Sequence, residues 1–271
     1  MDRGRPTETR ARAPRLADRA LLLRRFPYGE SSLVVHALTP EHGRVSFLAK
    51  GAYRPNSGFF AVLDLFDTLE LRWSARPGQE LGLLIAASLH TRRTALPADL
   101  ARYRAGHGLL ELAALAGREG HEERALFAWL EGALDLLQRG AAEVGVVCCA
   151  ADLAFLAMAG LAPALDRCAS CGRRPEEAGE RGAKTAFSRA SGGRLCPPCA
   201  AEARARGRAV ESLPLNLLRV AASLMSATPP MLEHMRVEPG LLERVRAFAE
   251  RFLEYHLETR LRSRRSAPTH P

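Results

Sequence analysis

The sequence predicts an α+β protein: a small N-terminal β-barrel followed by an α-helical domain that carries a four-cysteine zinc module. Three observations support this expectation. Up to residue 92 the apolar residues come in short blocks between turn residues, whereas from residue 93 they recur at helical spacing. Two CxxC pairs interrupt the helical pattern. The 271 residues are enough for two or three modest domains.

Five candidate strands make up the barrel. They are apolar blocks bounded by glycine, proline and threonine turns, at residues 21–23, 33–35, 45–48, 63–71 and 81–85. Short strands in such close succession fit a closed barrel of the OB-fold kind, because closure removes exposed sheet edges. We therefore expect an OB-fold nucleic-acid-binding domain over residues 17–92, after a disordered basic lead over residues 1–16.

Cations and one aromatic side chain gather on the connections of this barrel. Six residues are candidates for DNA binding: Arg24, Arg25, Arg44, Lys50, Tyr53 and Arg54. Cations neutralise phosphates and an aromatic face stacks on any base, so this mixture is typical of surfaces that bind single-stranded nucleic acid. The charges alone fit a solvated barrel rim equally well.

The overall charge narrows the class of partner. The formal net charge is +9, and all the cations except Lys50 and Lys184 are arginines, whose planar forks suit phosphates and stack on bases. An acidic protein tail or an anionic membrane would fit the charge too, and genome composition explains the arginine bias equally well. The lead has no apolar block, so no secretory signal is predicted. We expect a cytoplasmic, nucleoid-associated protein whose cysteines bind metal and form no disulfides.

Helical spacing recurs in four segments beyond the barrel, at residues 98–116, 122–138, 214–225 and 240–261. A further segment, 144–165, is almost free of charge and raises the question of a membrane span. Asp152 opposes that interpretation, because a carboxylate at the bilayer centre costs roughly 2.5–3.5 kcal/mol. We predict a buried core helix ended by Gly160 and Pro163, and no membrane contact. The helical domain is expected to cover residues 93–265, with a tail at 266–271.

Four cysteines give the most specific chemical signal. Cys168 and Cys171 form one CxxC pair, and Cys196 and Cys199 form another after 24 intervening residues. Four thiolates on two tight turns can hold one tetrahedral ion, so we predict a structural Zn²⁺ site in a module over residues 166–208, with a short hairpin between the pairs. All four positions are filled by protein, which leaves none for a catalytic water. A redox pair and an iron–sulfur cluster are the alternatives.

Enzyme motifs are not found in the sequence. It contains no phosphate-binding loop, no GxGxxG, no GxSxG elbow and no HExxH pair. Asp64, Asp67 and Glu70 are three residues apart, which does not keep them on one face of a strand. A metal-dependent nuclease is therefore not predicted. We expect a protein that is not an enzyme and has no small-molecule substrate.

The order of the motifs resembles the RecO family of bacterial DNA repair proteins, from about residue 17 to 265. The segments that carry the resemblance are YGESS at 28–32, LTPEHG at 38–43, AKGAYR at 49–54, the four cysteines, and LRSRR at 261–265. It implies a recombination mediator that binds single- and double-stranded DNA and anneals complementary strands. It also implies that the protein, with RecR, helps load RecA onto DNA coated by single-strand-binding protein, and contacts the acidic C-terminal tail of that coating protein.

Within this resemblance, Lys50 and Arg54 match the basic loop of the family. Some family members lack the metal site, which implies that zinc supports folding and is not essential to activity. The alternative from another class is an adaptor that docks acidic protein tails, with DNA contact incidental. A third interpretation, a zinc-module transcription factor, requires an arginine-bearing recognition helix next to the cysteine pairs, and none is predicted.

Overall fold

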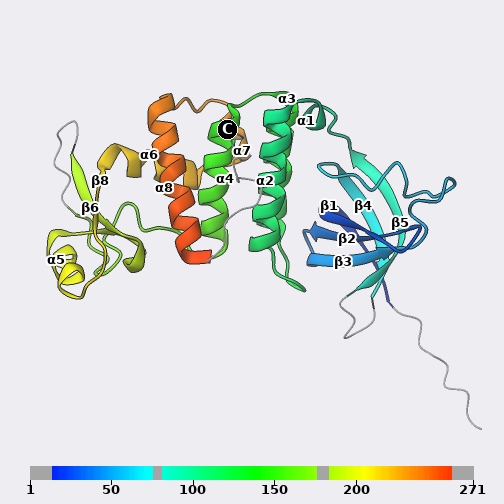
Figure 1. Cartoon of the computed structure of the whole chain (residues 1–271), viewed down its shortest axis with the longest axis horizontal. Helices are drawn as coiled ribbons and strands as arrows, with labels where there is room; N and C mark the ends of the chain where they lie inside the picture. The colour runs from blue at the N-terminus through cyan, green and yellow to red at the C-terminus, as the bar shows by residue number, and fades with distance from the viewer. Residues whose placement is uncertain (1–13, 76–80, 176–182, 258–271) are drawn as a thin grey trace, which may run out of the picture.

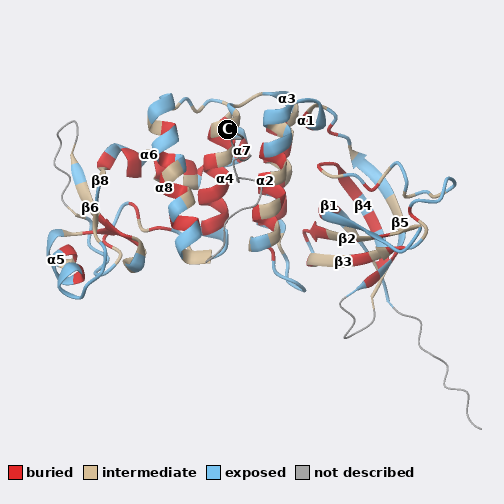
Figure 2. Ribbon diagram, in the orientation of Figure 1, coloured by how far each residue is buried: buried red, intermediate tan, exposed pale blue. Residues whose placement is uncertain are grey.

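The computed structural model describes residues 14–75, 81–175 and 183–257. A β-barrel lies at one end of the long axis, a helical bundle in the middle, and a small sheet with the four cysteines at the other end (Figure 1). Buried residues, red in Figure 2, lie along the helices of the bundle and the strands of the barrel, and they form two main hydrophobic clusters. The predicted fold class, an OB-like barrel followed by a helical domain, is confirmed.

The barrel is closed by five strands in the order β1-β2-β3-β5-β4. Neighbouring strands are antiparallel except β3 and β5, which are parallel. Alternate side chains point inward, and Phe47 and Trp73 meet in the core with ring centroids 5.0 Å apart. The strands are β1 (Arg15–Tyr28), β2 (Ser32–Thr39), β3 (Gly43–Ala49), β4 (Thr68–Ser74) and β5 (Gly82–Thr91).

The barrel begins earlier than the sequence predicted. Arg15 pairs with Ser74 of β4, so the last two residues of the predicted lead belong to the first strand. This strand is 14 residues long, because its two halves pair with different neighbours: the first half with β4 and the second half with β2. Residues 1–13 of the predicted lead lie outside the described residues.

The fourth strand starts later than predicted. The apolar run from residue 63 predicted a strand to residue 71, but β4 begins at Thr68. Phe66 has a φ of 71°, which no strand residue adopts, and its buried ring faces the helical domain. The apolar pattern of this stretch therefore reflects an irregular segment that is buried, not a strand.

Seven helices in the described residues form the bundle. The nearly uncharged α4 lies at its centre and packs against α2, α6 and α8, which confirms the predicted core helix; Asp152 is buried within it. No described helix has the length and apolar content needed to cross a bilayer. Residues 258–271, which include the predicted tail, lie outside the described residues. The helices are α1 (Ala95–Ala98), α2 (Leu100–Ala116), α3 (Arg124–Arg139), α4 (Val144–Met158), α6 (Leu215–Ser226), α7 (Pro229–Leu232) and α8 (Pro239–Leu257).

The cysteine module has a three-stranded sheet in the order β7-β6-β8. β6 (Lys184–Ser188) and β7 (Gly193–Leu195) form the predicted hairpin between the two cysteine pairs. β8 (Glu211–Pro214) pairs with the other edge of β6, so the sheet extends past residue 208, where the module was predicted to end. A helix, α5 (Pro197–Ala205), follows directly after Cys196.

The turn between β2 and β3 fixes the barrel to the helices. Gly43 has a φ of 65°, and a Cβ there would lie 2.2 Å from the carbonyl oxygen of Arg118. This close approach lets the amide of Arg44 donate to the same oxygen at 2.8 Å, and the amide of Glu123 donates to the oxygen of Pro40 at 2.8 Å. Glycine is therefore required at this contact between the barrel and the α2–α3 connection.

Arg93 forms a second contact between the two domains. Its side chain is 1% exposed, and its Nε donates to a carboxylate oxygen of Asp135 on α3 at 2.7 Å. Its Nη1 donates to the carbonyl of Phe66 at 2.6 Å and to the Thr68 hydroxyl at 3.1 Å. One guanidinium thus links the start of β4 to α3.

We expect Arg93→Ala to lower the free energy of unfolding by about 2–4 kcal/mol, because removal of a buried charge strands its partners. This loss of stability is smaller than the largest losses for broken buried ion pairs, because the Asp135 side chain is 44% exposed and water screens its charge. Urea unfolding measures the change. The exposed Arg72→Ala, on the outer side of β4, is the matched control and should stay within about 0.5 kcal/mol of the parent protein. Equal losses in the two variants would contradict the structural role of Arg93.

Candidate nucleic-acid interface and metal centre

The outer face of β1, β2 and β3 presents three rows of side chains, which we call the platform. Alternate residues of a strand point to the same face, so the strand register brings cross-strand neighbours into rows. Lys50 comes directly after β3 and extends the last row. The rows are Arg24, His36 and Ser46; Phe26, Val34 and Leu48; and Tyr28, Ser32 and Lys50.

The platform is the part of this face that the helical domain leaves open. Leu21 and Leu38, nearer the helices, are fully buried against them. Phe26 is 45% exposed and Tyr28 is 60% exposed, both on the second half of β1. Large aromatic side chains two residues apart on an open strand are unusual for a surface that contacts only water, and they have the geometry on which bases stack.

The loop after β3 lies against the same end of the platform. The amide of Tyr53 donates to the carbonyl of Ser31 at 2.9 Å, and the amide of Gly51 donates to the Ser32 hydroxyl at 3.3 Å. The motif at residues 28–32 and the motif at residues 49–54 are therefore neighbours in space. Tyr53, 45% exposed, adds a third accessible aromatic ring.

The six predicted DNA-binding residues fall into two groups. Arg24, Lys50 and Arg54 are exposed, and within the described part of the chain their side chains make no hydrogen bond or ion pair. Arg24 and Lys50 belong to the platform, and Tyr53 and Arg54 lie on the loop beside it.

Arg25 and Arg44 have structural partners instead. Arg25 donates to the carbonyl of Leu63 at 2.8 Å and pairs with Asp64 at 3.2 Å. Arg44 donates to the carbonyl of Ala114 at 2.7 Å and to Glu119 at 2.9 Å. We therefore place Arg25 at the barrel end and Arg44 at the joint with α2, where these partners hold its guanidinium.

Sequence reasoning did not include Phe26, Tyr28 or His36 among the candidate DNA-binding residues. The signal was the alternation of Arg24, Phe26 and Tyr28 along one strand, which marks a single face. The prediction treated the first strand as ending near residue 23, so this alternation was not considered. The structure extends β1 to Tyr28 and makes the face visible.

The four cysteines of the module meet at one point, as predicted. Their Sγ atoms all lie within 4.8 Å of one another, and the Sγ atoms of Cys171 and Cys196 are 3.8 Å apart. Sulfurs bound at about 2.3 Å in a tetrahedron are about 3.8 Å apart, so the cluster has the dimensions of a four-thiolate metal site. All four positions around an ion would be filled by sulfur, which fits a site that braces the fold.

The electrostatics of the cluster favour a thiolate at Cys168. Burial raises the pKa of this thiol, but the backbone amides of Cys196, Cys171 and Ser170 outweigh it and bring the pKa to about 6. Hydrogen bonding with Cys196 raises the pKa of Cys199 to about 12. A metal ion is the natural means of stabilising the further thiolates, because it binds the deprotonated form.

A short helix follows the second cysteine pair: α5 begins directly after Cys196 and contains Arg204. The helix is only 9 residues long and buries Ala200 and Ala203 against the module. Its inner face thus serves packing.

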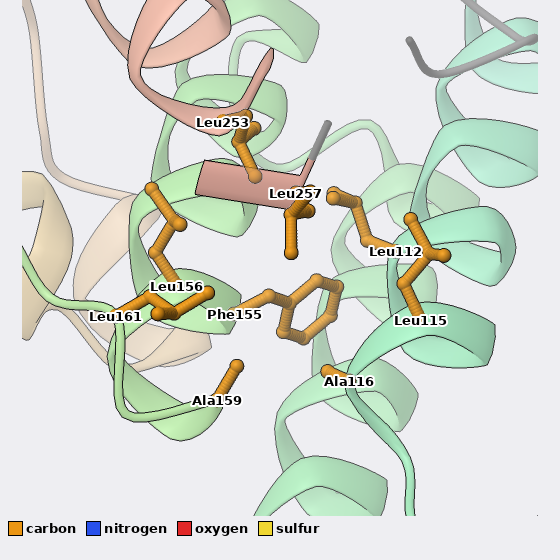
Figure 3. Close-up of a pocket in the computed structure, with 9 residues that line it drawn as sticks. All are labelled: Leu112, Leu115, Ala116, Phe155, Leu156, Ala159, Leu161, Leu253 and Leu257. Carbon is orange, nitrogen blue, oxygen red and sulfur yellow. The ribbon is translucent and has the colours of Figure 1, made fainter. Parts of the chain in front are cut away.

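A small apolar pocket opens between α2, α4 and α8, and we call it the bundle pocket. Figure 3 shows side chains from the three helices and the turn after α4 converging on it. Leu115 at its edge is 45% exposed. The lining is entirely apolar: Leu112, Leu115, Ala116, Phe155, Leu156, Ala159, Leu161, Leu253 and Leu257.

These features define a class of protein: an OB-like barrel with an open aromatic and basic face, supported by a helical domain that ends in a four-thiolate module. Comparison with known families gives the particular family. The model named Recombination protein O N terminal matches residues 15–92, and the model named Recombination protein O C terminal matches residues 97–265. The chain belongs to the RecO family of DNA repair proteins.

Individual relatives belong to the same family. The DNA repair protein RecO of Streptomyces griseus is 33% identical over 257 residues, covering 92% of this chain and 96% of that protein. The RecO of Myxococcus xanthus is 32% identical over 255 residues, with 92% and 95% covered. The RecO of Rhodopirellula baltica is 33% identical over 180 residues, and there the alignment spans 66% of this chain and 65% of the relative.

Proposed function

We propose that this protein is a recombination mediator that binds single-stranded DNA on the platform and anneals complementary strands. One observation carries the proposal: Phe26 and Tyr28 are exposed on one strand, with Arg24 in the first row of the platform and Lys50 in the last. Aromatic faces bind bases without regard to sequence, and cations bind the phosphates between them. A mediator needs this combination because it acts on any broken sequence.

The proposed mechanism makes and breaks no covalent bond. Two complementary strands repel each other through their phosphates, and exposed arginine and lysine side chains screen that repulsion. The same cations bind the backbone of duplex DNA, since phosphate contacts carry no sequence information. Base pairing itself supplies the free energy of annealing. The mediator role also includes loading RecA, with RecR, onto DNA coated by single-strand-binding protein.

We propose that the ion in the four-thiolate site is Zn²⁺ and that it is structural. Thiolates in a tetrahedral set suit zinc, and a fully occupied shell leaves no position for a reacting molecule. The module lies at the opposite end of the molecule from the platform (Figure 1). Zinc therefore stabilises the helical domain and does not touch a strand on the barrel.

Lys50→Ala combined with Arg54→Ala is expected to weaken single-strand binding and to flatten its salt dependence. Loss of two phosphate contacts lowers the slope of log K against log salt by about 1.4. Fluorescence anisotropy of a labelled oligonucleotide at several salt concentrations measures the slope. The control is Arg236→Ala with Arg251→Ala, which removes two exposed cations from the helical domain. An unchanged slope in the first variant would remove the loop from the interface.

A strand-annealing assay tests the activity as a whole. Complementary oligonucleotides coated with single-strand-binding protein should anneal faster with this protein than without it. The rate should fall in the Lys50→Ala, Arg54→Ala variant and stay near the parent value in the control. Failure of the parent protein to speed annealing, under conditions where it binds the oligonucleotides, would exclude the mediator role.

The bundle pocket favours a second binding function, the docking of the acidic tail of single-strand-binding protein. The pocket is lined only by apolar side chains and has a volume of about 20 Å³, so a terminal apolar side chain would dock over its mouth, and the net charge of +9 favours acidic residues around it. In this proposal the tail recruits the protein to coated DNA. The adaptor alternative, with incidental DNA contact, predicts peptide binding but negligible oligonucleotide binding at physiological salt.

Leu161→Asp is expected to weaken binding of a short acidic peptide with a terminal apolar residue by about tenfold or more, because it puts a carboxylate in an apolar pocket that faces an acidic ligand. Isothermal titration measures the affinity. Met231→Asp changes an exposed apolar residue on α7 and is the control. Oligonucleotide binding should be unchanged in both variants. Equal peptide affinity in the two variants would place the tail elsewhere.

A further inference from the structure

A groove of about 510 Å³ runs between the platform and the end of α2. Its barrel side is formed by the first row of the platform together with Leu23, Phe26 and Arg44, and its helical side by Ala114, Leu115 and Glu119. A volume of this size is typical of sites for small ligands and fits one nucleotide. The groove is therefore the point where a strand lying on the platform would meet the second domain.

The side chains on the barrel side are already arranged around a histidine. The Nδ1 atom of His36 lies 2.8 Å from the Ser46 hydroxyl, which leaves Nε2 as the ring nitrogen available to a ligand. Phe26 meets the His36 ring edge to face, with centroids 5.6 Å apart. Arg24 is the cross-strand neighbour of His36. The Arg24 cation, unpaired within the described residues, thus lines a single groove together with one imidazole and one aromatic ring.

The carboxylate on the helical side of the groove does not neutralise the positive charge of Arg24. The carboxylate of Glu119 accepts from the Nε and Nη2 atoms of Arg44 at 3.2 and 2.9 Å, so it is neutralised within the joint. Arg24 has no such acidic partner in the described residues. The groove consequently carries net positive charge, and an anion rather than a cation fits it.

We propose that this groove is a nucleotide subsite in which one phosphate of a single strand lies between Arg24 and His36 while the adjoining base packs on Phe26. The proposal deepens the DNA-binding function proposed above and rests on it. It adds His36, Ser46 and the wall of α2 to the interface, so that the strand touches both domains.

Proton uptake is a consequence of this geometry. Burial, then the guanidiniums of Arg24 and Arg44, hold the pKa of His36 below 6.5, while Glu119 acts in the opposite direction. A phosphate beside the ring stabilises imidazolium and raises the pKa in the complex. His36 then takes one proton from solvent when the strand binds. The added affinity is fully present below the pKa of the free protein and is lost as pH rises through the pKa of the complex.

The test is the pH dependence of oligonucleotide binding by the full chain. We use a dT strand of about 12 nucleotides, which suits the site size of one OB-fold. Between about pH 8 and about pH 5 the Kd of the parent protein should fall by up to about tenfold, the full effect of a pKa difference of one unit once the pH lies below the pKa of the free protein. His36→Gln keeps a hydrogen-bonding side chain beside Ser46 but cannot take the proton, so its Kd should change far less. The control, His90→Gln, replaces an exposed histidine on β5 and should behave like the parent protein.

Calorimetry in two buffers of different ionisation enthalpy gives an independent measurement. Near about pH 6.5, binding to the parent protein should take up a fraction of a proton. In His36→Gln this uptake should be lost, because glutamine cannot accept the proton. If His36→Gln retains the pH profile and the proton uptake of the parent protein, the subsite is refuted while DNA binding on the platform stands. If neither protein binds the strand at any pH, the proposed function itself fails.

Discussion

Replacing Phe26 and Tyr28 together with alanine is expected to raise the Kd for a single-stranded oligonucleotide about 30-fold or more. Each base stacked on an aromatic side chain contributes about 1–3 kcal/mol, so two such contacts supply at least about 2 kcal/mol. Both rings are largely exposed and neither belongs to the barrel core, so the fold should survive the change. Anisotropy titrations at fixed salt measure the effect.

The control for this variant is Tyr255→Ala, which removes an exposed aromatic ring from α8, in the helical domain. It should bind the oligonucleotide like the parent protein. The affinity of the Phe26, Tyr28 double variant for a duplex of the same length should fall much less, because paired bases are stacked on each other and unavailable to the platform. Equal losses for single-stranded and duplex DNA would mean that the two rings do not stack on bases.

Removing the metal is expected to have the largest effect on structure. Metal binding supplies about 10–16 kcal/mol in zinc-finger peptides, and the small cluster around Cys168 has only Leu195, Ala200 and Ala203 as buried apolar partners. Without an ion, the thiols and this core cannot hold β6, β7 and α5 together. We expect a strong chelator, or Cys168→Ser, to expose the module to limited proteolysis within residues 166–214.

The metal prediction has three further readouts. Purified protein should contain one ion per chain, and acid should release it, because protons compete for the thiolates. Cys148→Ser changes a half-buried cysteine on α4 and should keep the ion. Oligonucleotide affinity should change little after metal removal, since the platform lies at the far end of the molecule (Figure 1). Retained protease resistance without metal would show that the ion is not structural.

The periodicity of the sequence was a reliable guide to the regular elements. α2 and α3 lie within two residues of their predicted positions, since their apolar faces recur at helical spacing and Asp99 caps the first of them through the amide of Arg102 at 2.8 Å. The prediction of a strand at residues 63–67 was wrong, because the apolar pattern there has another cause. Leu63 and Phe66 are buried in an irregular segment, and burial alone does not distinguish such a segment from a strand.

The four cysteines of the cluster could also be predicted from the sequence. A CxxC turn places two sulfurs close together through local geometry, so only the meeting of two such turns depended on the fold. The cationic surface was different. Arg24 and Arg44 look alike in the sequence, but Arg44 binds Glu119, 75 residues away, and only Arg24 is left for a ligand.

The sequence by itself thus determined the kinds of elements, the family and the four-cysteine cluster, because periodicity, motif order and CxxC spacing are local properties of the chain. The tertiary structure decided which charged and aromatic side chains are available on the surface. That choice depends on strand register and on partners distant in the sequence: the pairing of β1 with β2 puts Arg24, Phe26 and Tyr28 on one open face, and the docking of α2 against the barrel turns one end of that face into a groove.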